Sequence, residues 1–248
     1  MLDHLAKIAT APTSPRFETH EEALERFPGL TRDAYALSRV INSEHGSGTP
    51  TEMCCIGDAD ANKAARQRRS IFDHVTAGTG QYGHQGEDKR PVSTARAPGP
   101  RHVVAALAVL AGPQPFGMRG IARGAERYFD VKAQAASAAS SPETHCPPLV
   151  ILERWTYSLP WGSERCTLGT KRGGDQQEWV GPIPGVDPYV LMLMRPATAH
   201  QDALYQDARR VIESRGSYKG RWLPDAVDLA LLAVVVGGAW LAAQGVIG

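Results

Sequence analysis

The chain has 248 residues, of which 42% are hydrophobic and 21% are charged, and its formal net charge is +1. This length and composition allow a sizeable core in one domain plus an appendage, which excludes a wholly disordered protein. The near-zero net charge gives no general attraction to nucleic acid or to anionic surfaces, and we expect no nucleic-acid partner.

Residues 1–17, MLDHLAKIATAPTSPRF, are expected to form an N-terminal arm. They contain no continuous apolar run and no small-residue cleavage site, so they do not predict a secretory signal peptide. Any export is therefore expected to use another route. Residues 18–28 predict a short polar helix that ends at Phe27-Pro28-Gly29, after which Thr31 caps the next helix.

The helix that follows Thr31 ends on an acidic residue, Glu44. Four apolar residues have the spacing of one buried helical face: Ala34, Leu37, Val40 and Ile41. The partial negative charge of the helix C-terminus and partial burial against this face both disfavour ionisation, and they predict that Glu44 holds its proton near neutral pH. A protonated carboxyl is what a general acid requires. The alternative interpretation is a solvated surface residue.

The next helix has a well-specified start. Gly46 and Gly48 turn the chain, and Thr49-Pro50-Thr51-Glu52 reads as an N-cap, a proline at the first helical position and a capping-box glutamate. Residues 70–77 predict a further short helix that is closed by Gly78. Residues 78–100 are rich in Gly, Thr, Gln and Arg, which predicts a small exposed hairpin and loop.

The apolar run from Pro100 to Ala111 predicts the buried central helix, since it is too short to cross a bilayer and stops at Gly112-Pro113. The small-residue tract at 135–141 is interpreted as a loop. From Leu149 the chain is rich in β-branched and aromatic residues between Gly and Pro, which predicts two or three strands up to about residue 195.

Three tryptophans of this region could stack on sugar rings or lie in the core: Trp155, Trp161 and Trp179. Tyr189 and Arg195 stand at the two ends of an apolar strand, where their polar tips can face a cleft. Four cysteines form no metal-binding pattern, and no metal or other cofactor is expected. Cys54 is interpreted as a small core residue, and Cys146 and Cys166 are expected not to pair because no other disulfide framework is visible.

Residues 197–225 predict a polar connector helix, which starts with Thr198 and Gln201 in a capping-box pattern. Residues 226–248 predict a membrane-spanning helix, because the last twenty residues contain no charge. Small residues four apart in this segment allow close helix contact or self-association. The alternative is a helix buried in a protein assembly. Five basic residues precede the segment: Arg209, Arg210, Arg215, Lys219 and Arg221.

Three segments in order resemble one enzyme family. They are ALSRVINSEHGSGTPTE with Asn62 one helix later, GQYG at 80–83, and GAERYFDVKAQ at 124–134. This set resembles the cell wall hydrolases related to spore cortex-lytic enzymes. The family usually has a small residue and then Arg after the glutamate, whereas His45 follows directly here. The resemblance implies a lysozyme-like fold, with Glu44 as the catalytic acid and a glycan groove lined by four residues: Gln81, Tyr82, Tyr128 and Phe129. Tyr189 is added as a fifth substrate-binding candidate.

The sequence thus predicts a lysozyme-like α+β domain over 18–196, with small hairpins and a C-terminal transmembrane helix. The expected activity is a lytic transglycosylase reaction on the β-1,4 MurNAc–GlcNAc bond of peptidoglycan, with a muramidase-type hydrolase as the other chemistry. A wall substrate, the missing signal and the terminal apolar segment together favour a bacteriophage virion protein that acts from the periplasmic side during entry. The alternative function is an inactive virion or membrane protein that keeps the scaffold for binding glycan or other virion proteins.

Overall fold

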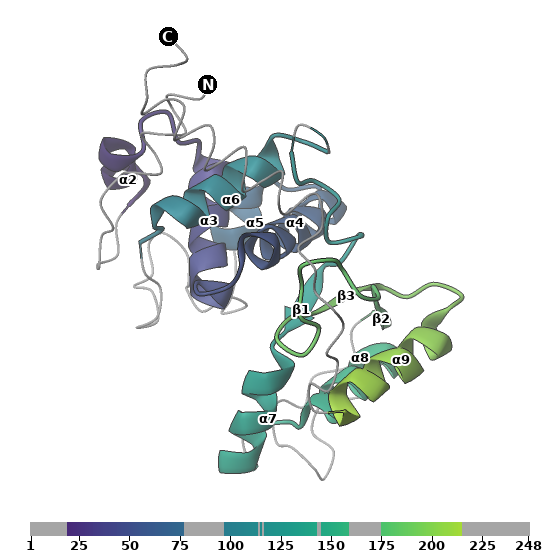
Figure 1. Cartoon of the computed structure of the whole chain (residues 1–248). Helices are drawn as coiled ribbons and strands as arrows, with labels where there is room; N and C mark the ends of the chain where they lie inside the picture. Colours follow the sequence, from purple (N-terminus) through teal and green to yellow (C-terminus); the bar gives the residue numbers. More distant parts are fainter. Residues whose placement is uncertain are drawn as a thin grey trace. The chain divides into compact units, whose positions relative to one another are not determined.

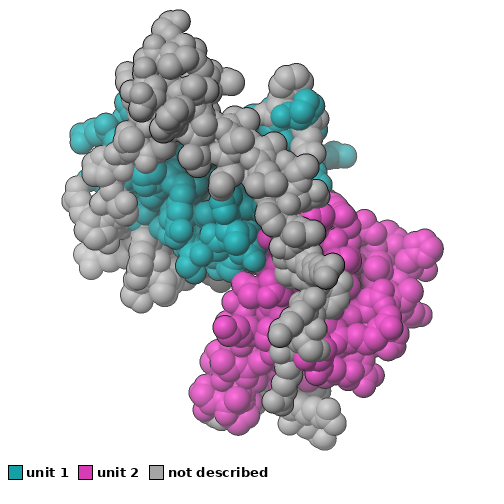
Figure 2. Space-filling view, in the orientation of Figure 1, with its two compact units in different colours: residues 1–121, 223–248 teal, residues 122–222 magenta. Residues whose placement is uncertain are grey.

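A computed structural model describes residues 19–76, 97–113, 115, 117–142, 145–158 and 175–214 of the chain. The chain divides into two compact units (Figure 2). Unit 1 comprises residues 1–121 and 223–248, and unit 2 comprises residues 122–222. The described residues combine helices with a small antiparallel sheet, so the expected α+β class is confirmed.

Unit 1 is helical in its described part (Figure 1). Its helices are α2 (His20–Arg26), α3 (Arg32–His45), α4 (Pro50–Arg66), α5 (Ile71–Thr76) and α6 (Pro100–Leu110). Helix α3 packs against α4, α5 and α6, and its residues from Ala34 to Ile41 are all buried. The apolar run of α6 is therefore part of the helical core, as its composition predicts.

The predicted helix starts in unit 1 are confirmed. Local side chains accept hydrogen bonds from N–H groups of the first turn that would otherwise lack a partner. The Thr31 side chain accepts a hydrogen bond from the Ala34 N–H at the start of α3. Thr49 and Glu52 form the predicted capping box of α4, with Pro50 at the first position. A capping box that the sequence pattern did not single out starts α2, formed by Thr19 and Glu22.

Gly57 allows the close packing of the central helices. A Cβ atom at this position of α4 would lie 3.1 Å from Cδ1 of Ile41 and 3.4 Å from Cγ2 of Val109. These distances are shorter than ordinary van der Waals contact, so a larger residue would push α4 away from α3 and α6. A glycine within a helix costs about 1 kcal/mol relative to alanine, which the tight packing offsets.

Unit 2 contains a three-stranded antiparallel sheet and three helices. The strands are β1 (Arg127–Phe129), β2 (Gln177–Trp179) and β3 (Met192–Pro196), in the order β1-β3-β2. The helices are α7 (Val131–Ser140), α8 (Pro148–Tyr157) and α9 (Gln201–Glu213). Helices α8 and α9 lie side by side and both pack on β2.

Two segments of unit 2 have a different secondary structure from the one expected. Residues 135–140 of the expected loop at 135–141 belong to α7. Oδ1 of Asp130 accepts from the Ala133 N–H at 2.7 Å and so caps the helix, and alanine strongly favours helix. The run after Leu149 is α8 rather than a strand. Pro148 takes the first helical position, and Leu152 faces the core. A short apolar run does not by itself show whether it forms a helix or a strand.

Helix α9 is a core element of unit 2, which corrects the expectation of a connector for the described part of residues 197–225. Its residues Ala208, Val211 and Ile212 are buried in the same hydrophobic cluster as Leu152 and Met192. These three residues have helical spacing and form a narrow apolar stripe on an otherwise polar helix. The helix begins at Gln201, after His200, and not at the expected cap Thr198.

Cys146 is disulfide-bonded, which corrects the expectation that it would not pair. Cys54 and Cys55 are free and buried, as expected for small core residues. Cys166 lies outside the described residues, as do the N-terminal arm, most of the 78–100 hairpin and the apolar segment 226–248. Among the described helices none is long and apolar enough to cross a membrane.

Candidate active site

Glu44 lies in the last turn of α3 and is exposed. Partial burial against the apolar face was expected, and this part of the prediction is wrong. Glu44 does follow Leu37 and Ile41 on the same helical stripe, but the buried core ends at Ile41 and α3 continues one turn beyond it. The helix C-terminus still places a partial negative charge beside Glu44.

The end of α3 is fixed to the start of α6 by hydrogen bonds on either side of Glu44. Asn42 donates from Nδ2 to the carbonyl of Ala97 at 2.9 Å. The carbonyl of Gly46, the C-cap of α3, accepts from Nε2 of His102 at 3.1 Å and from Nη2 of Arg101. These bonds use groups that a helix terminus otherwise leaves unsatisfied. The backbone that carries Glu44 is thus held on both sides.

His102 is neutral in this arrangement. Its Nδ1 accepts a hydrogen bond from the Gly99 N–H at 2.9 Å, so Nε2 carries the proton that is donated to Gly46. Burial lowers the pKa of His102, and the positive charge of Arg101 lowers it further, whereas the hydrogen bond to the Gly46 carbonyl raises it in part. The lowered pKa agrees with the neutral ring that the hydrogen bond from Gly99 requires.

His45 and Glu52 form a pair across the turn that follows Glu44. Nε2 of His45 lies 3.1 Å from Oε2 of Glu52, which also accepts from the Thr49 N–H at 2.8 Å. Burial alone would raise the pKa of Glu52, but the hydrogen bonds from His45 and Thr49 outweigh it and lower the pKa. Glu52 is therefore a carboxylate near neutral pH and not a proton donor.

Gly48 makes this turn possible. A Cβ at Gly48 would lie 2.1 Å from Cδ2 of the His45 ring, which is far below any real contact distance. The imidazole packs over the glycine, and a side chain here would displace it from Glu52.

A second polar group joins α4 to the loop after α6. Arg119 donates through Nη1 to Oδ1 of Asp58, to the carbonyl of Asp58 at 3.2 Å and to Oδ1 of Asn62 at 2.9 Å. Asp58 is completely buried. The Asn62 of the resembled motif thus helps to hold Arg119, and Asp58 is committed to an ion pair.

The predicted substrate-binding residues are distributed over the chain. Gln81 and Tyr82 lie outside the described residues. Tyr128, Phe129 and Tyr189 belong to unit 2, whereas Glu44 belongs to unit 1. Tyr128 and Tyr189 are half-buried.

Phe129 is not a groove residue, which corrects the expectation. It is buried and packs edge to face on Trp155, with ring centroids 5.3 Å apart. It stands at a sheet position whose side chain faces the hydrophobic core of unit 2, and Trp179 is buried in the same cluster. Trp179 is therefore a core residue, and Trp155 is partly buried and packs against the same core, which favours the second of the two interpretations that the sequence left open. Trp161 lies outside the described residues.

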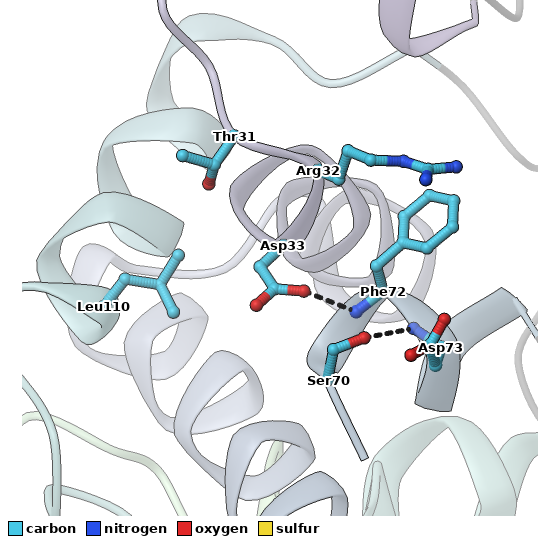
Figure 3. A pocket seen from close by; sticks show the side chains of 7 residues that line it. All are labelled: Thr31, Arg32, Asp33, Ser70, Phe72, Asp73 and Leu110. Atoms are coloured by element: carbon cyan, nitrogen blue, oxygen red, sulfur yellow. Dashed lines mark hydrogen bonds between the residues drawn. The ribbon is translucent and has the colours of Figure 1, made fainter.

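A shallow depression of about 570 Å³ opens at the other end of α3 (Figure 3). One of its polar groups connects α3 to α5, since Oδ1 of Asp33 accepts from the Phe72 N–H at 2.8 Å. Ser70 Oγ accepts from the Asp73 N–H at 2.9 Å at the start of α5 itself. The Arg32 guanidinium covers the Phe72 ring at 3.9 Å. Since α3 rises about 1.5 Å per residue, the depression lies roughly 15–20 Å from Glu44 along the helix. It is not part of the predicted site.

The capping residues and Glu44 could be found from the sequence, but the residues that hold Glu44 could not. His102 is at the third position of α6, where a side chain can reach back to the N-cap, and this is the only local signal of its role. Nothing in the sequence pairs Asn42 with Ala97 or Arg119 with Asp58. Within the described residues no group of His, Cys, Asp or Glu could hold a metal ion.

The comparisons with known proteins found no match. No family model, no curated protein and no solved structure matches this chain. The candidate site is therefore defined by its own geometry and by the motif resemblance alone.

Proposed function

We propose that the chain is a peptidoglycan-degrading enzyme, a lytic transglycosylase in which Glu44 is the sole general acid and then the base. The observation that carries the proposal is the exposed carboxyl of Glu44 on a backbone fixed at Asn42 and Gly46. A polymeric substrate needs an accessible acid, and efficient proton transfer needs an acid held in one place. Both requirements are met at the end of α3.

The chemistry of neighbouring carboxylates supports a one-acid route. A hydrolase that uses two carboxylates needs the second roughly 5–9.5 Å from the first, across the scissile bond. In the described part of unit 1, Glu52 is bound to His45 and Thr49, and Asp58 is bound to Arg119. Neither is available as a nucleophile or as a base for water. Glu87 and Asp88 lie outside the described residues and remain the candidates for a hydrolase.

In the one-acid route, Glu44 protonates the glycosidic oxygen as the bond to the muramic C1 breaks. The oxocarbenium-like centre is then attacked by the 6-hydroxyl of the same muramic residue, whose proton returns to Glu44. The bond from O6 to C1 replaces the glycosidic bond, so no water is consumed and Glu44 ends as it began. The half-buried Tyr128 and Tyr189, together with Gln81 and Tyr82, are proposed to contact the glycan.

We further propose that residues 226–248 attach the protein to a membrane and that a bacteriophage virion carries it to the periplasmic side of the wall. The support is the twenty-residue stretch without charge at 229–248. The fold proposed for the catalytic region is lysozyme-like, and the helical unit 1 with the small sheet of unit 2 is compatible with it.

One observation favours the alternative, an inactive binding protein of a virion or membrane complex. Glu44 is exposed, and an exposed glutamate at a helix end needs no catalytic role. The two functions differ in whether the wall polymer is cleaved.

A zymogram on purified murein separates them. We expect a clearing band from the wild-type chain and none from Glu44→Gln, which keeps the shape of the side chain and removes its acidic proton. Glu25→Gln is the matched control, because Glu25 is also an exposed carboxyl in the last turn of a helix, α2. Clearing by Glu44→Gln, or none by the wild type, would overturn the enzymatic proposal.

A further inference from the structure

His45 follows Glu44 directly in the last turn of α3, and a carboxylate binds its imidazole. One oxygen of Glu52 accepts from Nε2 of His45 at 3.1 Å and from the Thr49 N–H at 2.8 Å, and the lowered pKa of Glu52 keeps it charged near neutral pH. A carboxylate can only accept hydrogen bonds. Nε2 of His45 therefore carries a proton, and in the neutral ring Nδ1 presents a lone pair.

The surroundings of Gly48 show which way this ring points. The atoms nearest to a Cβ at Gly48 would be Cδ2 and Nε2 of His45, and the third nearest is Oε2 of Glu52 at 3.2 Å. The other three ring atoms are therefore farther than 3.2 Å from this Cβ position, so the ring meets Gly48 with its Cδ2–Nε2 edge. Nδ1 is opposite that edge in an imidazole ring. It consequently points away from the turn between α3 and α4.

Nδ1 is also the less occupied of the two ring nitrogens. Among the residues that the structure describes, His45 forms its hydrogen bond through Nε2 alone. Its side chain is 11% exposed. Since Gly48 and Glu52 cover the Cδ2–Nε2 edge, the exposed part lies on the remaining side of the ring, which carries Nδ1. A lone pair is thus open to a small group such as a hydroxyl, next along the chain to the exposed Glu44.

The charged groups around His45 suit proton transfer at Nδ1. Glu52 fixes the tautomer, and its negative charge can compensate the positive charge that arises when Nδ1 takes up a proton. Arg101 is a positive group at the same end of α3, where it binds the Gly46 carbonyl, and its charge acts in the opposite direction. His102 binds the same carbonyl as a neutral ring. A carboxylate that holds one nitrogen of an imidazole and leaves the other accessible is the arrangement of a general base.

We propose that His45 carries the proton of the attacking hydroxyl back to Glu44. This inference rests on the proposed transglycosylase function and describes its second step. As O6 of the muramic residue bonds to C1, its O–H bond breaks and the proton moves to Nδ1 of His45. The imidazolium then gives this proton to the carboxylate of Glu44, which lost its own proton to the leaving group in the first step. Both side chains end as they began, and Glu44 remains the only acid.

Steady-state kinetics on purified glycan strands of murein test the role of His45. His45→Gln keeps a group that can donate to Glu52 but has no basic nitrogen, so kcat should fall by about 10²- to 10⁴-fold while KM changes less than about threefold. His20→Gln is the matched control, because His20 is also a half-buried histidine of unit 1 and bonds through Nε2 to the Leu30 carbonyl at 2.7 Å. The kcat of this control should stay within about twofold of the wild type.

Gly48→Ala tests the same role without a change at His45. A methyl group at Gly48 displaces the ring from Glu52, so kcat should fall by about tenfold or more. If this loss acts through His45, the double variant His45→Gln, Gly48→Ala should be no slower than His45→Gln alone. If the turn has a merely structural role, the two losses should multiply instead. Urea unfolding of each variant separates a loss of folded protein from a loss of kcat.

Two further measurements respond to the base itself. Added imidazole should restore part of the activity of His45→Ala, which leaves space where the ring lies, and none of the activity of Glu44→Gln. Nitrogen NMR of the full chain should show a protonated Nε2 and an unprotonated Nδ1 in the neutral ring of His45, and this readout does not depend on activity.

The outcomes separate this inference from the proposed function. A proton on Nδ1 of the neutral ring, a kcat of His45→Gln within about threefold of the wild type, or multiplying losses in the double variant would overturn the role of His45. Murein cleavage by the wild type would still support the enzyme in each of these cases. If the wild type leaves murein intact, the proposed function fails, and the proton route through His45 fails with it.

Discussion

The imidazole of His45 lies 3.1 Å from the carboxylate of Glu52, across the turn that joins α3 to α4. This hydrogen bond adds to the capping box that Glu52 forms with Thr49. A single carboxylate thus starts α4 and holds the residue next to Glu44.

Replacement of Glu52 by Gln should lower the free energy of unfolding by about 1–2 kcal/mol, because the charged hydrogen bond to His45 and the favourable charge at the helix N-terminus are lost. Urea unfolding at pH 7 measures the change. Glu22→Gln is the control, since Glu22 occupies the same place in the capping box of α2. Gln can also complete a capping box, so an equal loss in both variants would show that His45 adds nothing.

The buried His74 should make the protein less stable in acid. Its folded pKa is about 4, lowered first by burial and then by Lys63 and Arg69, whereas an unfolded histidine has a pKa near 6.5. The unfolded state therefore binds the proton first. The contribution of the neutral His74 to the free energy of unfolding is therefore complete above pH 6.5. About 3 kcal/mol of this contribution is lost as the pH falls towards 4.

His74→Gln removes this titration, so its free energy of unfolding should change less than that of the wild type between pH 7 and 4.5. Urea unfolding at both pH values gives the comparison. The variant is expected to be weaker at pH 7, where it loses the packing of the ring and the 2.9 Å hydrogen bond to Gln67. Parallel pH profiles for the two proteins would contradict the assignment.

The sequence predicts the features that depend only on residues close together in the chain, such as the starts of helices. Thr49, Pro50 and Glu52 specify the start of α4 within four residues, and the structure has that start. The run after Leu149 predicts a strand, because a short apolar stretch has no clear period, whereas in the structure Pro148 begins a helix. Its helical state depends on packing against α9, whose residues lie about fifty positions later.

The candidate site was predictable only in part for the same reason. Glu44 follows Ile41 with helical spacing, which suggests burial, but burial also depends on where the neighbouring helices end. That is a property of the tertiary structure. The bond from Asn42 to Ala97 and the bond from His102 to Gly46 each span more than fifty residues. No local pattern reports such contacts.

In unit 2, Glu178 should be a costly carboxylate to neutralise. It is completely buried and accepts hydrogen bonds from Arg195 Nε at 2.8 Å and from Thr198 N–H at 2.9 Å. Burial would raise the pKa of Glu178, but the bonds from Thr198 and Arg195 outweigh it and lower the pKa. Glu178→Gln should therefore cost about 2–3 kcal/mol at pH 7.

Glu213→Gln is the matched control for Glu178→Gln, because Glu213 pairs with Arg209 on the exposed surface of α9. That pair should contribute less than about 0.5 kcal/mol. Urea unfolding should show a large loss for Glu178→Gln alone. The loss should shrink as the pH falls below 4.5 through the lowered pKa, where the wild type also loses the charge.

Arg68→Gly should raise the free energy of unfolding by about 1 kcal/mol, because glycine removes the Cβ strain of a left-handed residue at the end of α4. Thermal unfolding measures the change. Arg68→Ala keeps the Cβ and therefore the strain, so it should show no gain in stability.

The reaction products should decide the role of Glu44. With Glu52 and Asp58 bound to His45 and Arg119, the one-acid route predicts muramic ends that carry an internal 1,6-anhydro bond. Mass spectrometry of a murein digest detects these ends as fragments lighter by one water than the products of hydrolysis. Glu44→Gln should abolish both kinds of end while its free energy of unfolding stays within about 0.5 kcal/mol, because the side chain is exposed. Reducing muramic ends would instead show that water attacks the sugar and that a second carboxylate takes part. Glu87→Gln would then be the next variant to test, since a loss of activity there would identify that residue.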